Sequence, residues 1–336
     1  MKVDELRVAL SRYDAAELKE IAVMLYKVIP KKRKESDGLD DILLNFTTEK
    51  AKPTKKETLV DIGVLQEEIV TFIEYASESL YLAPNRIVNK DKRSKWRFEV
   101  RRFVKELIAT SGENSETAAM LLADIYEMLC YACYYLIFSS DNPFSAIGYA
   151  QQDYLRLVLD RMFYSGFSQD TVKKAVFLTL DSNADKNTSH LTLLYELVSM
   201  LKTPDTKEMA LAQCVAYAKE YSVYQAMKRV FGYPVKKDEY RESEHKNHAA
   251  ELYLLLKFSL HEYDEGIAFF WENYKEHRKE ITLFYLLAYF LSSKELSALW
   301  LREYEKAVAG GIEPRESLQR EYEKRKNSEN EDKESP

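Results

Sequence analysis

The chain has 336 residues, of which 46% are hydrophobic and 31% are charged, and its formal net charge is −6. This balance is typical of a folded globular protein and excludes a chain that is disordered throughout. The scarcity of glycine and proline, with 9 and 8 residues, argues against turn-rich folds such as β-sandwiches and against glycine-rich phosphate loops.

The sequence lacks the patterns of secretion and membrane insertion. Acidic residues, Asp4 and Glu5, stand where a secretory signal carries an apolar run. The longest uncharged apolar stretches, 128–140 and 281–293, are shorter than the ~20 residues that span a bilayer. Three cysteines do not make a disulfide framework in a chain of this length. We therefore expect a reduced, cytoplasmic protein that does not contact membranes.

The first helix is predicted to begin at Asp14, because Glu17 three residues on completes a capping box. Apolar residues then recur with the period of a helix until Pro30 ends it. A short second helix is predicted near 39–46, and a polar, lysine-rich linker follows over 47–57.

The remainder of the chain is predicted to be helical almost throughout, with breaks at glycine, proline, asparagine and aspartate. The expected helices lie near 59–82, 93–110, 116–139, 143–165, 168–182, 188–202, 205–219, 221–231, 238–262, 264–278, 280–291 and 293–309. No stretch alternates polar and apolar residues for long enough to predict a strand. From Arg315 onward the residues are mostly charged, which predicts a fraying helix that runs into disorder.

The predicted fold class is all-α: an array of antiparallel helix pairs, similar to an α-solenoid, with an N-terminal helical bundle part. Two successive helices recur every ~40–50 residues, which is the range of helical repeats. The predicted organisation is an N-terminal helical pair (1–49), a central helical domain (57–232), a C-terminal helical-repeat-like part (236–311) and a charged, disordered tail (315–336).

One segment, 255–270, resembles the turn of a tetratricopeptide unit. One helix ends there, an acidic turn containing Tyr263 follows, and Gly266 and Ala268 are small enough to let the next helix pack closely. The resemblance covers about one repeat, around 250–285, and implies a helical-repeat fold in this part of the chain.

A second resemblance involves the segments 10–46 and 96–183. Together they look like a group of small, uncharacterised all-helical bacterial proteins. This resemblance implies a fold and no function.

A basic helix near 92–105 is the main candidate for a binding surface. At 100° per residue, its apolar residues form one stripe: Trp96, Val100, Phe103, Val104 and Leu107. The opposite side carries Lys95, Arg97, Phe98, Arg101, Arg102 and Lys105. Lysine and arginine neutralise phosphates, and an aromatic ring among them can stack on an unpaired base. The interpretation we favour is a solvated exterior, with Glu99 and Glu106 alongside the cations and Phe98 docked on a neighbouring helix.

Lysine clusters at 31–34 and 50–56 offer two similar interpretations. They can extend the basic surface, or they can belong to a helix end and a linker, where cations are favourable. We favour the structural interpretation.

Cys130 and Cys133 have the spacing of a redox pair or of half a metal site. They lie inside an apolar helix, away from the helix N-terminus that would lower a thiol pKa. No second pair completes a zinc site, since Cys214 stands alone. We therefore predict that both thiols pack in the core.

His245, His248 and Glu251 share one helical edge, a pattern that suits either a divalent metal or a polar, exposed helix start. We favour the exposed helix start, treat His190 as isolated, and predict neither a metal nor another cofactor.

Asp153, Arg156 and Asp160 have the spacing of ordinary ion pairs along a helix. No nucleophile or general base can be connected to them, so we predict no catalytic site there.

Tyrosine is abundant, with 24 residues. Tyr131, Tyr134 and Tyr135 crowd the middle of the chain, where they suit helix packing or a peptide-binding groove, and we favour packing.

These observations favour a non-enzymatic scaffold or adaptor that binds a protein or peptide, since helical arrays present extended binding surfaces. That inference is an analogy between folds. The alternative is a nucleic-acid-associated regulatory protein that binds phosphates through the basic helix at 92–105.

Overall fold

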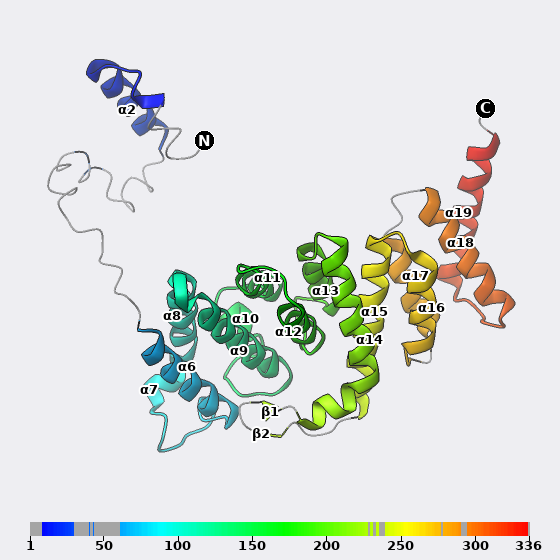
Figure 1. Cartoon of the computed structure of the whole chain (residues 1–336), viewed down its shortest axis with the longest axis horizontal. Coiled ribbons are helices and arrows are strands. Elements are labelled where there is room, and N and C mark those ends of the chain that lie inside the picture. The colour runs from blue at the N-terminus through cyan, green and yellow to red at the C-terminus, as the bar shows by residue number, and fades with distance from the viewer. Residues whose placement is uncertain are drawn as a thin grey trace. The chain divides into compact units, whose positions relative to one another are not determined.

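The chain is all-α, as predicted (Figure 1). The computed structural model describes residues 9–29, 40, 43, 61–227, 229–230, 233–234, 239–276, 278–289 and 294–334. It divides into two compact units, Met1–Val60 and Asp61–Pro336. The predicted division of the second unit into domains near 232–236 and 311–315 stays a prediction, as does the α-solenoid arrangement.

The described part of the first unit centres on α2 (Ala15–Val28). The Asp14 carboxylate accepts a hydrogen bond from the backbone nitrogen of Glu17 at 2.9 Å, and the Glu17 carboxylate accepts one from the Asp14 nitrogen at 2.9 Å. The predicted capping box is therefore present. No residue of α2 is buried, so its apolar residues, Leu25 and Val28 among them, face solvent.

Three predictions for this unit concern residues outside the described part of the chain. They are the short helix near 39–46, of which only two separate residues are described, and the lysine clusters at 31–34 and 50–56.

The second unit begins with four helices and a short 3-10 turn. They are α6 (Ile62–Ser77), α7 (Lys90–Ser94), α8 (Trp96–Ala109), η1 (Gly112–Asn114) and α9 (Ser115–Tyr134). α6 is shorter than the predicted helix over 59–82, because Ser79 takes a left-handed conformation, with φ 59°.

Five helices follow: α10 (Pro143–Ala146), α11 (Gln151–Met162), α12 (Gln169–Leu180), α13 (His190–Met200) and α14 (Pro204–Met227). The prediction of one helix over 143–165 is wrong, because the chain breaks between α10 and α11. Gly148 has a φ of +81° there, a conformation that favours glycine.

The helices predicted over 205–219 and 221–231 form one continuous helix, α14, which ends at Met227, and a small hairpin follows it. β1 (Arg229–Val230) pairs with β2 (Tyr233–Pro234) in antiparallel register, Arg229 opposite Pro234. Proline lacks a backbone donor and is tolerated in such edge pairings.

The last part of the chain contains α15 (Glu239–Ser259), α16 (Tyr263–Asn273), α17 (Lys279–Tyr289), α18 (Lys294–Ala309) and α19 (Glu316–Glu334). The helix predicted to begin near Arg315 is present as α19, and it extends to Glu334, through residues for which disorder was predicted. The ring of Tyr322 stacks on Tyr304 of α18 with centroids 4.6 Å apart, and the Arg325 guanidinium lies 4.9 Å from the ring centre of Trp300. These contacts attach the first turns of α19 to α18.

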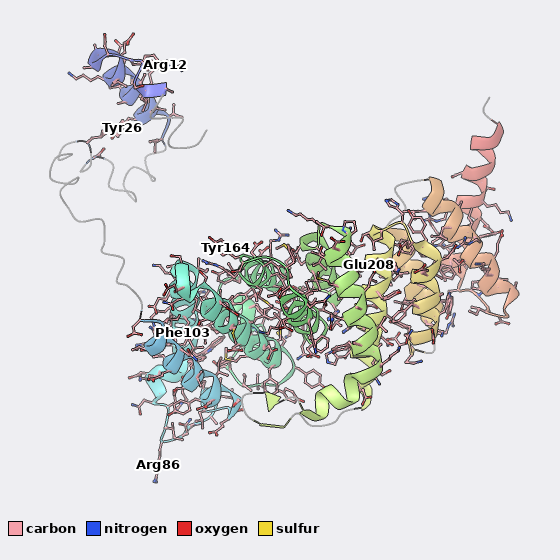
Figure 2. The ribbon with its side chains drawn as sticks, in the orientation of Figure 1. Arg12, Tyr26, Arg86, Phe103, Tyr164 and Glu208 are labelled. Carbon is pink, nitrogen blue, oxygen red and sulfur yellow. The ribbon has the colours of Figure 1, made fainter. Side chains whose placement is uncertain are left out.

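Helices of the second unit contact one another in a regular order. α9 packs on α11, α11 on α13 and α13 on α15, while α12 packs on α14 and α14 on α15. The side chains between them are shown as sticks in Figure 2. The most extensive contacts join helices that are adjacent in the chain, α14 with α15 and α15 with α16.

Aromatic residues fill the core at both ends of this unit. Near its start, the Trp96 and Phe138 rings stack with centroids 4.0 Å apart. Towards its end, Phe270, Phe284 and Trp300 belong to one buried cluster from α15 to α18. Burial of each such ring contributes roughly 1.5–3 kcal/mol relative to exposure.

Residues 179–190 run from the last turn of α12 to the first residue of α13, and we call this segment the α12–α13 connection. It is hydrogen-bonded to several other helices. Gln151 of α11 is 0% exposed; its side-chain amide donates to the Asn183 carbonyl at 2.9 Å and accepts from the Asp185 nitrogen at 2.7 Å. Asn183 in turn donates to the carbonyl of Cys130 in α9 at 3.0 Å.

Two later helices also bind this connection. The Tyr217 hydroxyl of α14 donates to the Asp181 carboxylate at 2.6 Å. His245 of α15 bonds the Leu180 carbonyl through Nδ1 at 2.8 Å. The connection therefore links α9, α11, α14 and α15 in addition to their direct packing.

Gly266 makes the close approach between α16 and α15 that the tetratricopeptide-like turn predicts. A Cβ at this position would lie 3.0 Å from the Lys257 Cβ and 3.3 Å from the Leu254 Cδ1. Ala268, which was also predicted to lie at the close approach, is exposed. Of these two small residues, only Gly266 therefore lies in the contact between α15 and α16.

Replacing Gly266 by valine should lower the free energy of unfolding by about 1–3 kcal/mol, because a branched side chain overpacks the α15–α16 contact. Urea unfolding followed by circular dichroism measures the loss. Ala268→Val is the matched control, since it adds the same kind of side chain to the exposed side of α16. Equal effects from the two substitutions would contradict the packing explanation.

Candidate functional site

The basic helix forms as predicted, and its apolar stripe is the buried one. Trp96, Val100, Phe103, Val104 and Leu107 are the buried residues of α8. All six residues predicted for the opposite side are exposed: Lys95, Arg97, Phe98, Arg101, Arg102 and Lys105. The structure therefore places the predicted binding residues on one exposed face.

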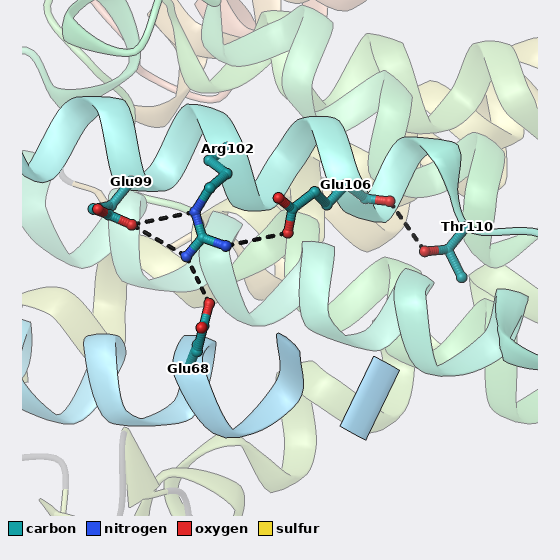
Figure 3. A network of polar contacts seen from close by, with 5 residues as sticks. All are labelled: Glu68, Glu99, Arg102, Glu106 and Thr110. Carbon is teal, nitrogen blue, oxygen red and sulfur yellow. Dashed lines mark hydrogen bonds and ion pairs between the residues drawn. The ribbon is translucent and has the colours of Figure 1, made fainter. Parts of the chain in front are cut away.

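Two of the five cations on this face are engaged by the protein itself. Arg102 forms ion pairs with Glu68 of α6 at 2.6 Å, Glu99 at 3.2 Å and Glu106 at 3.3 Å (Figure 3). Three carboxylates surround this guanidinium, which leaves it little positive field to offer a ligand. Arg102 therefore joins α8 to α6.

Arg101 is engaged in a different way. Its guanidinium donates to the carbonyl oxygens of Ile147 at 2.9 Å and Ala146 at 3.0 Å, which lie at the end of α10. It also lies 3.4 Å from where a Cβ of Gly148 would be. Arg101 therefore caps a neighbouring helix and fills the space beside the glycine.

The remaining part of the face consists of Lys95, Arg97, Phe98 and Lys105. Phe98 is 52% exposed, and the guanidinium carbons of Arg97 and Arg101 lie 5.0 and 5.7 Å from its ring centre. An exposed ring flanked by cations matches the pattern expected for stacking on a base. It also matches a cation–π pairing within a solvated surface.

The three tyrosines at the end of α9 lie together. The Tyr131 and Tyr135 rings have centroids 4.4 Å apart, and the Tyr134 and Tyr135 rings have centroids 4.8 Å apart. Tyr134 is 52% exposed and Leu136 is 62% exposed. We call these four residues the tyrosine cluster.

Cys130 and Cys214 lie in the core, whereas Cys133, which was also predicted to pack there, is half-buried. Cys130 is buried, and removal from water raises the pKa of its thiol to about 12, despite a hydrogen bond from the Gln151 amide at 3.4 Å. Burial also raises the pKa values of Cys133 and Cys214. None of the three thiols is disulfide-bonded. Thiols in such surroundings are protonated and unreactive at neutral pH.

The histidines are arranged differently from the prediction. His245 is buried and capped by the Leu180 carbonyl, so the exposed helix start predicted for this segment is wrong. His190, predicted to be isolated, stacks on His248 with ring centroids 3.3 Å apart and planes at 10°. One ligand atom each from His190, His248 and Glu251 lie within 4.8 Å of one another.

Hydrogen bonding defines the chemistry of this group, which we call the histidine cluster. His190 Nε2 lies 3.2 Å from the Thr179 carbonyl oxygen. Because a carbonyl only accepts, Nε2 carries the proton and Nδ1 carries the lone pair. The Nδ1 atoms of His190 and His248 are buried and have no hydrogen-bond partner in the described part of the chain.

Burial sets the charge state of the histidine cluster. It lowers the pKa of His190 to about 3 and that of His248 well below its usual value, so both imidazoles are neutral. Burial, with the nearby charge of Glu276, raises the pKa of Glu251 to about 8. The Tyr274 hydroxyl lies 3.5 Å from the Glu251 carboxyl.

Two other places are candidates for functional sites: the charged face of α11 and a pocket beside α16. Arg156 forms a bidentate pair with Glu196 of α13, at 2.7 and 2.8 Å, while Asp153 and Asp160 are exposed. A pocket of about 490 Å³ between the start of α16 and α18 is lined by His261 and Arg302 among others. The Arg302 guanidinium is already paired with acidic side chains, which leaves it no free charge for a ligand.

Sequence reasoning missed His190 because it lies in α13, far along the chain from His248 and Glu251 in α15. The three-residue steps on α15 suggested His245 instead, and its Nδ1 is occupied by a carbonyl. No spacing rule relates two helices that meet only through tertiary packing.

Comparisons with known proteins supply no relative from which a function could be inferred. No protein-family model, curated protein or solved structure matches the chain significantly. Among the described residues, no helix combines the length and the apolar character that crossing a bilayer requires.

The raised pKa of Cys130 leads to a direct test. At pH 8 a thiol with a pKa of about 12 is ionised in roughly one molecule in ten thousand, so iodoacetamide should not modify Cys130 in the folded protein. Peptide mass spectrometry should find full modification only after unfolding in urea. Rapid alkylation of the folded chain at Cys130 would make the cysteine pair a reactive site.

Proposed function

We propose that the protein is a non-enzymatic scaffold that binds a protein or peptide partner, and that the tyrosine cluster is the centre of the binding surface. The observation that carries the proposal is the group of three touching tyrosine rings beside Leu136, with more than half of the Tyr134 and Leu136 side chains exposed. Tyrosine rings are rigid and amphipathic, and they are enriched at the energetic centres of protein interfaces.

The surroundings of the cluster support this proposal. Tyr134 ends α9, whose other faces are buried against α6, α8 and α11, so the cluster is presented from a rigid helix. Rigid presentation lowers the entropy cost of binding.

The double substitution Tyr134→Ala with Leu136→Ala should weaken partner capture, since truncation of a central tyrosine commonly costs about 2 kcal/mol, or roughly 30-fold in affinity. The measurement is quantitative mass spectrometry of proteins retained from a lysate of the native source by the immobilised full chain.

The matched control is Tyr164→Ala. Tyr164 is 76% exposed and follows α11, so its loss removes a comparable ring from another place (Figure 2). A partner of the tyrosine cluster is retained by the control and lost by the double variant. Identical sets of retained proteins for all three chains would contradict the proposal.

A second candidate function rests on Phe98. This exposed ring with cations around it supports binding of single-stranded nucleic acid by α8. The structure leaves fewer cations for a ligand than the sequence suggests, because Arg101 and Arg102 are bound to other parts of the protein. Of the five cations on this face, Lys95, Arg97 and Lys105 remain for phosphates.

If α8 binds a single strand through these three cations, the affinity should fall roughly 20-fold between ~50 and ~200 mM salt. Fluorescence anisotropy with a labelled oligonucleotide measures this fall. The triple variant Lys95→Gln, Arg97→Gln and Lys105→Gln should abolish binding while keeping Arg101 and Arg102, and with them the fold.

A control with the same charge change keeps α8 intact. Lys173, Lys174 and Lys202 are exposed on or after other helices and can be replaced by glutamine together. No binding by the wild type at the lowest salt, or equal loss in both triple variants, would exclude α8 as a nucleic-acid site.

A further inference from the structure

We propose that His190, His248 and Glu251 bind a divalent transition-metal ion, with zinc the best match to the donor set, and that the ion fastens α13 to α15. The inference is independent of the proposed partner binding.

The proximity of three ligand atoms is the first argument. Atoms from all three residues lie within 4.8 Å of one another. Zinc–nitrogen and zinc–oxygen bonds of ~2.0–2.2 Å in a tetrahedron place ligand atoms about 3.3 Å apart. The separations between ligand atoms therefore have to contract by at most about 1.5 Å. α13 and α15, which carry the ligands, pack directly on one another (Figure 1).

The unpartnered nitrogens are the second argument. Buried imidazole nitrogens are normally hydrogen-bonded, and leaving one without a partner costs about 1–3 kcal/mol. His245, on the same helix, follows that rule through the Leu180 carbonyl. The Nδ1 atoms of His190 and His248 do not follow it in the described part of the chain. A metal ion would supply the missing partner for both.

The outer contacts are the third argument. A metal-binding histidine usually donates its other N–H to a carbonyl or carboxylate, which fixes the ring and directs the lone pair. His190 does this through Nε2 and the Thr179 carbonyl. The Tyr274 hydroxyl, 3.5 Å from the Glu251 carboxyl, is placed to play the same part for the third ligand.

The donor chemistry is the fourth argument. Two imidazole nitrogens and one carboxyl oxygen suit zinc better than magnesium or calcium, which prefer oxygen alone. Glu276 and Glu244 add negative charge near Glu251, which favours a dication. Three protein ligands leave one tetrahedral position for water.

One rearrangement accompanies binding. The His190 and His248 rings are parallel and stacked, whereas a metal lies in the plane of each ring that binds it. His190 is held by Thr179, so His248 is the ring that turns. Its Nδ1 has no hydrogen bond to lose, whereas the contact of the ring with the Leu180 backbone would change.

The test uses the untagged full-length chain, freed of metal with a chelator. Calorimetric titration with Zn²⁺ should show one equivalent bound, and addition of Zn²⁺ should raise the melting temperature. Replacement by Co²⁺ should give the visible bands of a four- or five-coordinate site.

Glu251→Gln and His248→Gln should each lower zinc affinity by more than the ~10- to 100-fold that loss of an outer partner costs. His261→Gln is the matched control, because His261 is an exposed histidine in the α15–α16 turn. It should bind one equivalent as tightly as the wild type. Circular dichroism establishes that each variant is folded.

X-ray absorption of the zinc-loaded wild type decides the question even if a variant unfolds. Two imidazole ligands are expected. Absence of stoichiometric zinc binding, coordination without imidazole, or binding that persists unchanged in folded Glu251→Gln and His248→Gln chains would each overturn the proposal.

Discussion

The carbonyl oxygens at helix C-termini are the constraint on which the second unit depends. The last turn of every helix leaves carbonyls without an internal partner, and glycine-based caps are the common solution. With 9 glycines in 336 residues, this chain has few such caps available. Gly148, Gly166 and Gly311 take left-handed conformations after α10, α11 and α18, and donors from neighbouring helices bind carbonyls at several helix ends as well.

Several helix ends are capped in this way. Arg101 of α8 caps α10, and Arg161 of α11 donates to the Thr110 carbonyl after α8 at 3.2 Å. His245 of α15 caps α12, and Lys207 of α14 donates to the Ser259 carbonyl of α15 at 3.2 Å. Each bond satisfies a backbone group and attaches one helix to another, so helix termination and tertiary packing have a common cause. One of these bonds, between His245 and the Leu180 carbonyl, lies at the α12–α13 connection, and the histidine cluster lies beside it.

Local features of the sequence predict those parts of the structure that are decided locally. The stripe of α8 follows from 3.6-residue periodicity, and the start of α2 follows from Asp14 and Glu17, because both depend on neighbours within one or two turns. The all-α class follows from many such segments together.

Features decided by contacts between helices are not predictable in the same way. Arg102 belongs to the basic face by periodicity, but Glu68 of α6 changes its role from ligand binding to helix attachment. Tyr322 and Arg325 appear in a charged tail, and only the rings of Tyr304 and Trp300 on α18 explain why α19 is ordered. The α10–α11 break likewise depends on Arg101 beside Gly148.

The bonds of the α12–α13 connection also bear on how the chain reaches its folded state during synthesis. Gln151 is joined to Asn183 across 32 residues, and Leu180 to His245 across 65. The connection leaves the ribosome after α9 and α11 and well before α15. We expect the Leu180 carbonyl to stay hydrated in a nascent chain until His245 has emerged, so that α12 acquires its native end late. Protection of the α12 amides in stalled chains of increasing length would reveal this order, and full protection before α15 is made would refute it.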